Sequence, residues 1–384
     1  MLGFHEELQL EFGLTFKDLY DRDGLLKLDE IFRDRLESAD PALHGRLLEA
    51  RSHWEGDRKA ESDLILALAP LLEEFITALF GIDSDVQDLR RQQSKCEDFY
   101  TVKRKFIHKR ALTGMNAELA AAIDGAFLER ELEALFGEAL TDFTFAENVA
   151  RWMRQEAQYG EHLRKASHYA AWATLAPAGK ARQGGTKLFR APSKIDPYHL
   201  VPVETLVENG FLSFQLNPGL RRFRDGFDLT DEGGDLLDCL DEANYCIKCH
   251  NQQKDSCSTG LIEKDGQFKK SAFGVNLNGC PLDEKISEMN TLKLAGYTIS
   301  ALATIVIDNP ICAGTGHRIC NDCVKACIFQ KQEPVDIPQI ETGILKDSLT
   351  LPWGFEIYSL LTRWNPLNFR RPLPKPVEAF PSRT

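Results

Sequence analysis

The cysteines carry the strongest chemical signal in this sequence, because eight of the ten lie between positions 246 and 327. These are Cys246, Cys249, Cys257, Cys280, Cys312, Cys320, Cys323 and Cys327. The spacing Cys246-Ile-Lys-Cys249 recurs as Cys320-Asn-Asp-Cys323, and Cys327 follows the second pair closely. Two thiols at this spacing lie on one tight turn, where both can bind the same metal ion or cluster. The pattern therefore predicts a metal or iron-sulfur site.

Three kinds of cysteine chemistry compete for this pattern. Structural disulfides need an oxidising compartment, but the N-terminus, beginning Met1-Leu-Gly-Phe-His, has neither the basic nor the apolar segment of a secretory signal. Zinc would take Cys246, Cys249, Cys320 and Cys323 as a closed four-thiolate site and leave the other four as small core residues. Iron-sulfur ligation uses more of the cysteines at once. We therefore expect a cytoplasmic iron-sulfur protein, with a zinc-stabilised module as the alternative.

Short motifs surround these cysteines. They are Asn244-Tyr-Cys246-Ile-Lys-Cys249, Gly279-Cys-Pro-Leu282, Asp308-Asn-Pro310, Gly316-His-Arg-Ile-Cys320, Cys327 and Pro334-Val-Asp-Ile-Pro-Gln-Ile-Glu341. Together they resemble the N-terminal two-cluster helical domain of the glutamate synthase small subunit and of dihydropyrimidine dehydrogenase. The resemblance covers residues 236–345, under a third of the chain.

The resemblance implies a ligand set for each of two 4Fe-4S clusters, with iron bound through the same residues. Cys246, Cys249, Cys257 and Cys327 would hold the first cluster, and Cys280, Cys320, Cys323 and Glu341 the second, with Cys312 as an alternative fourth ligand. Two features depart from the family. Residues 258–279 form an insert before the Cys-Pro step, and the Cys320 to Cys323 spacing is shorter than usual. Asp265-Gly266 predicts a hairpin turn within the insert.

The composition predicts a protein with ordinary hydrophobic cores and no dedicated nucleic-acid surface. The 384 residues are 43% hydrophobic and 27% charged, which is typical of soluble globular chains. A formal net charge of −12 is opposite in sign to that of most nucleic-acid-binding domains. Asp63 and Glu73-Glu74 interrupt the most apolar helical pattern, so we expect no membrane span. Proteins and small molecules are the expected partners.

Apolar residues at spacings of three and four predict a mainly α protein. We expect a helical N-terminal bundle, followed by an α-helical ferredoxin-like two-cluster domain with irregular loops. The predicted domains are a helical domain of unknown role over 1–180, an irregular connecting segment over 181–235, the two-cluster domain over 236–345, and a short helix with a proline-rich tail over 346–384. Leu64 to Phe80 carries the clearest stripe, and Pro70 is expected to kink or divide it.

Several further local predictions follow from caps and turn residues. Helices are expected over 116–137, from Thr144 toward Trp172, and over 235–243, 283–304 and 351–364. Gly314 and Gly316 are expected in turns beside the cysteines. Cys96 and Cys239, the two remaining cysteines, are expected as packed thiols rather than ligands.

The chain has no Gly-x-Gly-x-x-Gly after a predicted strand, so we expect the flavin-binding Rossmann domain of the resembling proteins to be missing from it. The favoured interpretation is the N-terminal part of a longer reductase, and the other is a chain whose flavin-binding reductase partner is separate. FAD and NAD(P)H are expected only on that missing domain or partner. We expect the chain to relay single electrons to a further redox partner as the iron-sulfur part of an oxidoreductase, with no catalytic residues of its own. The competing hypothesis is a zinc-stabilised protein-interaction module without redox activity.

Overall fold

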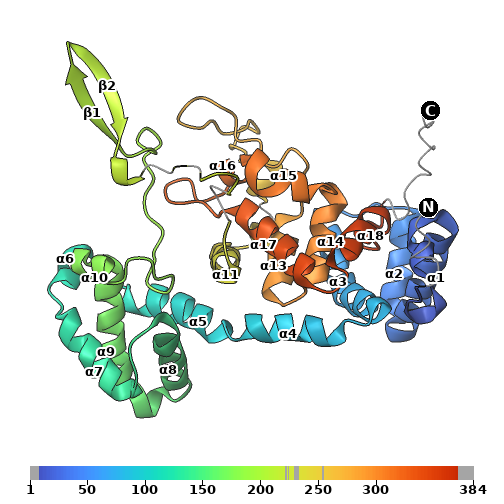
Figure 1. The fold of residues 1–384 in the computed structure, drawn as a ribbon, viewed down its shortest axis with the longest axis horizontal. Coiled ribbons are helices and arrows are strands. Elements are labelled where there is room, and N and C mark those ends of the chain that lie inside the picture. The colour runs from blue at the N-terminus through green and yellow to red at the C-terminus, as the bar shows by residue number, and fades with distance from the viewer. Residues whose placement is uncertain (1–7, 221–222, 224, 229–232, 253–254, 371–384) are drawn as a thin grey trace. The chain divides into compact units, whose positions relative to one another are not determined.

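The computed structural model describes residues 8–220, 223, 225–228, 233–252 and 255–370 of the chain. It is mainly α-helical, which confirms the predicted fold class (Figure 1). Contacts within the chain define two compact units, one made of Met1–Ile82 with Ser193–Thr384 and the other of Asp83–Pro192. The first unit is therefore discontinuous in sequence, and it contains every cysteine predicted to bind a cluster.

The first unit is built around four helices, α3, α13, α14 and α17, which pack against one another. Its elements are the 3-10 helices η1 (Glu11–Gly13), η2 (Phe16–Tyr20), η4 (Pro218–Leu220) and η5 (Cys249–Gln252), the strands β1 (Val203–Glu208) and β2 (Phe211–Leu216), and the helices α1 (Arg22–Ala39), α2 (Pro41–Ser52), α3 (Arg58–Phe80), α11 (Leu236–Tyr245), α12 (Ser256–Thr259), α13 (Ile286–Leu294), α14 (Thr298–Asp308), α15 (Cys312–Ile319), α16 (Asp322–Lys325), α17 (Ile337–Thr350) and α18 (Gly354–Arg363). Segments from both ends of the chain thus share one core.

Helix α3 has well-defined ends and a buried apolar stripe. Asp57 caps its start by accepting the Ala60 amide at 2.8 Å, and Gly81 ends it with a φ of 64°. Leu68 and Leu72 are fully buried on either side of Pro70. The helix runs through Pro70 as one element, so of the two predicted alternatives, a kink or a division, the division is wrong. The free energy gained by burying one continuous apolar stripe exceeds the cost of the single backbone hydrogen bond that proline removes.

A cluster of aromatic rings joins the N-terminal helices to the end of α18. The Trp364 ring is fully buried, with its centroid 5.7 Å from those of Phe32 and Phe75. Its Nε1 donates to Asp29 at 3.1 Å, and Arg51 donates two further bonds to that carboxylate at 2.7 and 2.9 Å. The buried carboxylate is therefore well paired, as its removal from water requires.

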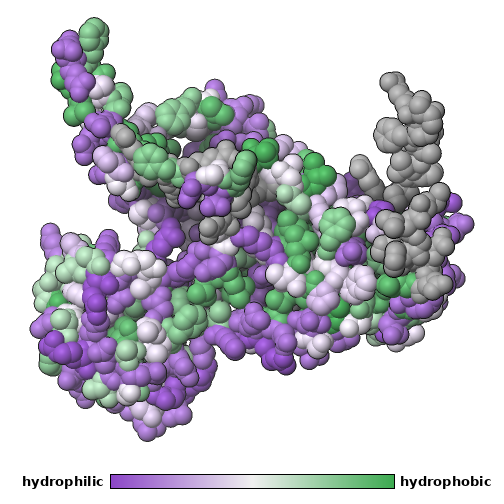
Figure 2. All heavy atoms as spheres, in the orientation of Figure 1, coloured by the Kyte–Doolittle hydropathy of each residue, from purple (hydrophilic) through white to green (hydrophobic). Residues whose placement is uncertain are grey.

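Strands β1 and β2 form an antiparallel hairpin inside the segment that was predicted to be irregular. Asn209 and Gly210 form its two-residue turn with φ of 52° and 81°, the conformation of a type I′ turn. Val207 and Leu212 face each other across the strands and are 71% and 62% exposed. Figure 2 shows hydrophobic side chains on the surface of this hairpin.

The second unit is a bundle of shorter helices. It contains α4 (Asp83–Ser94), α5 (Glu97–Thr101), the π-helix η3 (Val102–Ala111), α6 (Ala117–Ala121), α7 (Gly125–Phe136), α8 (Asp142–Arg154), α9 (Glu156–Leu175) and α10 (Pro177–Arg182). The helix predicted over 116–137 is two helices, because Asp124 caps a new one by accepting the Phe127 amide at 2.9 Å. The helix predicted from Thr144 is likewise divided, into α8 and α9, and it begins earlier because Thr141 is its cap. Cys96 is buried here, as predicted.

Other local predictions in the first unit had mixed outcomes. The helix predicted over 283–304 is interrupted at Gly296, whose φ of 81° separates α13 from α14. Gly314 and Gly316 lie within α15 rather than in turns, because the chain is already helical from Cys312 onward. The helices expected over 235–243 and 351–364 are present as α11 and α18. The proline-rich tail from residue 371 lies outside the described residues.

Candidate metal centre

Helix ends and short turns position the cysteines of the first unit. Cys246 follows α11, Cys249 begins η5, Cys257 lies in α12, Cys312 begins α15, Cys323 lies in α16, and Cys280, Cys320 and Cys327 lie in the connecting turns. The first of these helices is fixed by Asp235, which accepts the Asp238 amide at 2.8 Å. Cys239 points instead into the core, where its Sγ contacts the Ile340 carbonyl at 3.8 Å, and burial raises the pKa of this thiol to about 12.

Four thiols form a first group, and they are those predicted to hold the first cluster. Burial, followed by the neighbouring Cys246 and Cys327, raises the pKa of the Cys249 thiol to about 11. Burial also raises the pKa of Cys257, whose neighbours are Asp255, Cys246, Cys327 and Cys249. Such thiols keep their protons in the metal-free chain, so binding of a metal must release those protons. The four thiols are electrostatic neighbours, and their ligation of a cluster stays a prediction.

Backbone amides point at several of the sulfurs, as they do around metal-bound thiolates. The Lys248 N–H donates to Cys246 Sγ at 3.4 Å, and the Asp322 N–H donates to Cys320 Sγ at 3.5 Å. Each Cys-x-x-Cys turn therefore makes the same hydrogen bond from the amide two residues further on. Lys248 has a φ of 53°, which allows this close return of the backbone.

A second group combines thiols with carboxyl groups. Burial raises the pKa of Cys323 well above its usual range, and the charges of Glu341 and Cys280 add to that rise. Burial also raises the pKa of Glu341 to about 10, supported by a hydrogen bond to Glu284. Cys312 has the same two carboxyl groups as neighbours, and its Sγ lies 3.8 Å from the Tyr358 hydroxyl. Glu284 was not predicted from the sequence. The one signal that could have indicated it is its position four residues after Cys280.

Cys320 differs from the other ligands that were predicted for the second cluster. Its side chain is exposed, whereas that of Cys323 is buried. Its Sγ contacts are with the backbone and carboxylate of Asp322, at 3.5 and 3.6 Å. Among the described residues, the groups that most strongly shift the pKa values of Cys280, Cys323 and Glu341 do not include Cys320, so its membership of the second ligand set stays a prediction.

One backbone hydrogen bond connects the two groups directly. The Cys280 N–H donates to the Cys257 carbonyl at 2.8 Å. Ser258 strengthens the junction, because its hydroxyl donates to Asp283 Oδ1 at 3.1 Å and to the Glu284 carbonyl at 2.7 Å. The backbone segments that carry Cys257 and Cys280, predicted ligands of different clusters, are thus hydrogen-bonded to each other.

The insert between Cys257 and Cys280 leaves this junction and returns to it. The Leu261 N–H donates to the Leu277 carbonyl at 2.9 Å, which closes the insert at its base. Gly260 and Gly279 make the closure possible, since a Cβ on Gly279 would lie 2.5 Å from the Gly260 nitrogen. The backbone thus meets again at the base of the insert, beside Cys257 and Cys280.

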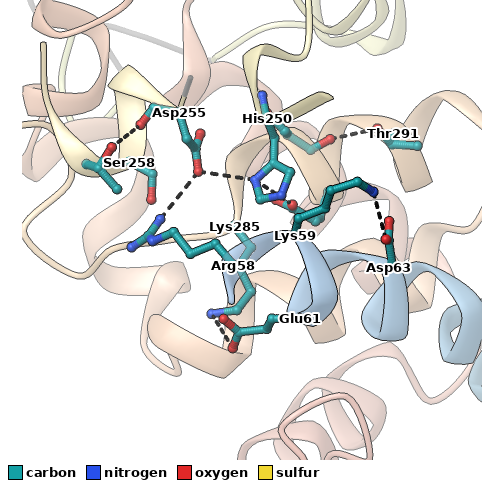
Figure 3. A network of polar contacts seen from close by, with 12 residues as sticks. Arg58, Lys59, Glu61, Asp63, His250, Asp255, Ser258, Lys285 and Thr291 are labelled. Atoms are coloured by element: carbon teal, nitrogen blue, oxygen red, sulfur yellow. Dashed lines mark hydrogen bonds and ion pairs between the residues drawn. The ribbon is translucent and has the colours of Figure 1, made fainter. Parts of the chain in front are cut away.

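A buried polar network lies beside the first group (Figure 3). His250 Nδ1 lies 3.2 Å from Glu288 Oε1 and 3.6 Å from Asp255 Oδ2. Arg58 Nη1, from α3, lies 3.5 Å from the same Asp255 oxygen. Asp255, Glu288 and Arg58 were not predicted from the sequence, because no motif marks them and they are distant along the chain from one another.

The described side chains do not form a site for a single metal ion. Within the described part of the chain, no three His, Cys, Asp or Glu side chains lie close enough to hold one metal ion. A zinc site needs four ligands at about 2.3 Å from one ion, and the set of Cys246, Cys249, Cys320 and Cys323 stays a prediction. In a 4Fe-4S cluster each thiolate binds a different iron, so the sulfurs surround a larger volume.

None of the helices in the described ranges combines the length and the apolar character that a membrane-spanning helix needs.

Two proteins of Rickettsia prowazekii (strain Madrid E) are similar to this chain, and both are described only as uncharacterized. The RP005 protein is 30% identical over 303 residues, which cover 74% of this chain and 98% of that protein. The RP006 protein is 71% identical over 63 residues, which cover 16% of this chain and only 9% of that protein. Residues 10–81 match the family model of the RP005 N-terminal alpha-helical domain. No solved structure matches the chain.

Proposed function

We propose that this chain, which belongs to the RP005 family, is the iron-sulfur electron-transfer module of a flavin-linked, NAD(P)H-dependent oxidoreductase. Single electrons would pass through two clusters, between a flavin and a further redox centre. Flavin and nicotinamide would bind to another domain or subunit, because the candidate ligands found in this chain are thiols and carboxyl groups.

The observation that carries this proposal is the division of the thiols into two adjoining groups. One group has the four thiols that a 4Fe-4S cluster requires, and the other combines thiols with Glu341. The hydrogen bond from the Cys280 amide to the Cys257 carbonyl joins them. Two centres linked by so short a path suit a relay of electrons better than two independent structural sites.

The residues of the chain have three tasks in this function. Bound clusters supply reversible one-electron chemistry. The thiols would hold the iron after losing their protons, the amides of Lys248 and Asp322 donate to sulfur, and the buried helices would limit the access of water. Hydrogen bonds to sulfur stabilise the more negative, reduced state and so raise the reduction potential.

An absorption spectrum of the anaerobically purified protein tests the proposal, with iron, sulfide and zinc measured on the same sample. We expect a brown protein with a broad band near ~400 nm that bleaches on reduction, and about eight iron atoms per chain. A colourless protein with one or two zinc atoms and no sulfide would overturn the proposal in favour of a structural zinc module.

Glu341 and Cys312 give different expected results as the fourth ligand of the second cluster. Glu341 Oε1 is buried without a hydrogen-bond partner, whereas the Cys312 thiol already contacts Tyr358. Glu341→Ala should therefore lower the iron content from about eight toward about four atoms, because the second cluster loses one of its four ligands. Cys312→Ala should retain all of it. Iron loss in the Cys312 variant alone would assign the ligand to the thiol instead.

A further inference from the structure

Arg58 links the N-terminal helices to the cysteine loops. It is the first residue of α3 and lies within residues 10–81, which match the family's N-terminal domain. Its side chain is 44% exposed, so its head group lies at the edge of the network rather than in the core. Figure 3 shows it reaching from α3 toward the loop that carries Asp255 and Ser258.

The guanidinium of Arg58 contacts two carboxylates, and each belongs to a different cysteine loop. Nη1 lies 3.5 Å from Asp255 Oδ2, and Nη2 is hydrogen-bonded to Asp283. Asp255 stands immediately before α12, which contains Cys257, and its carbonyl accepts the Thr259 amide at 2.8 Å. Asp283 donates its N–H to the Cys280 carbonyl at 3.1 Å. One cation therefore spans the loop of the first group and the loop of the second.

Besides this cation, hydrogen bonds among the described residues link the two loops. They are the bond from the Cys280 amide to the Cys257 carbonyl and the bonds from the Ser258 hydroxyl to the Asp283 carboxylate and the Glu284 carbonyl. Hydrogen bonds to charged groups are about twice as strong as neutral ones, and a planar guanidinium fixes two carboxylates in one geometry. Arg58 can therefore fix the position of one cysteine loop relative to the other.

We propose that Arg58 is a positioning residue that clamps the two cysteine loops together and whose positive charge raises the reduction potential of the clusters they hold. The second part rests on the proposed function, whereas the first part is a property of the chain alone. A fixed positive charge stabilises the reduced state, which carries one more electron.

Three variants separate the clamp from the charge. Arg58→Gln removes the charge and the second carboxylate contact, whereas Arg58→Lys keeps the charge as a point that cannot bridge both carboxylates. Lys59→Gln is the matched control, because it changes the charge by the same amount at the next position. Lys59 pairs with Asp63 on its own helix at 2.7 Å, and both side chains are exposed.

Hydrogen exchange of the metal-free chain tests the clamp. In Arg58→Gln we expect the Cys280 and Thr259 amides to exchange about tenfold faster, since a charge-assisted bond no longer opposes opening of the loops. Arg58→Lys should give an intermediate rate, and Lys59→Gln the wild-type rate. Equal exchange in Arg58→Gln and Lys59→Gln would overturn the clamp.

A redox titration of the iron-loaded protein tests the charge. Arg58→Gln should shift the potentials of both clusters to more negative values, Arg58→Lys should restore them, and Lys59→Gln should leave them unchanged. Unshifted potentials in Arg58→Gln would overturn this part of the proposal. A wild-type chain without iron and sulfide would instead refute the proposed function, and the exchange experiment would still decide the clamp.

Discussion

Replacing Cys249 by alanine should remove one of the two clusters and lower the iron content from about eight to about four atoms per chain. Cys249 is buried among the thiols of the first group, with Cys246 and Cys327 as neighbours. Its loss leaves three thiols for a cluster that needs four ligands, and no spare cysteine is expected to replace it, because Cys280 and Cys323 belong to the second group. Iron and sulfide analysis of the purified variant measures the effect.

Cys239→Ala is the matched control for this prediction. Cys239 is also a buried thiol of the first unit, but it packs in the core between α11 and α17, against Gly343 and the Ile340 carbonyl. Removing its sulfur should cost on the order of 1 kcal/mol of stability and leave about eight iron atoms in place. Full iron content in the Cys249 variant would refute the assignment of the first group.

Trp364→Ala should produce the largest loss of stability in the first unit, about 3–5 kcal/mol. The Trp364 ring is fully buried between Phe32 and Phe75, so its removal leaves a large cavity at the junction of the N-terminal helices with α18. The Asp29 carboxylate loses the indole donor but keeps both bonds from Arg51, which limits the polar part of the cost. Chemical denaturation followed by circular dichroism measures the change without relying on tryptophan fluorescence.

Phe355→Ala, on the helix that Trp364 follows, provides the comparison. Phe355 is 65% exposed, so truncating it should change the free energy of unfolding by less than about 0.5 kcal/mol. If the Trp364 variant unfolded at the same denaturant concentration as the Phe355 variant, the N-terminal helices and α18 would not share a core in solution.

The elements with strong local patterns were the ones that sequence reasoning predicted well. The stripe of Leu64 to Phe80 gave α3, and the aspartate before the first cysteines gave α11 with Cys239 inside. Helix boundaries were less predictable where a cap lies inside an apolar pattern, as Asp124 does. The spacing alone does not reveal such a cap, because the apolar positions continue on both sides of it.

The hairpin of β1 and β2 was missed although its turn was visible in the sequence. Asn209-Gly210 is the commonest signature of a type I′ turn, and strand-forming residues flank it. The prolines at positions 202 and 218 lie outside the strands and mark their limits rather than excluding them. Composition over the whole segment concealed this local pattern.

The candidate site was predictable in its thiols and unpredictable in its surroundings. Cysteine spacing and family resemblance grouped Cys246, Cys249, Cys257 and Cys327, which are neighbours in the structure. Arg58 reaches this site from about two hundred positions earlier in the chain. No local pattern encodes such a contact, because it depends on how distant helices pack.

The discontinuous first unit has a consequence for how the chain is made. Residues 83–192 can complete their own unit soon after synthesis, whereas the apolar stripe of α3 must wait for α13 and α14. At ordinary rates of translation this interval is on the order of tens of seconds. Exposed apolar surface on a growing chain favours aggregation. The N-terminal helices are therefore the part of the nascent chain with the greatest need of chaperones.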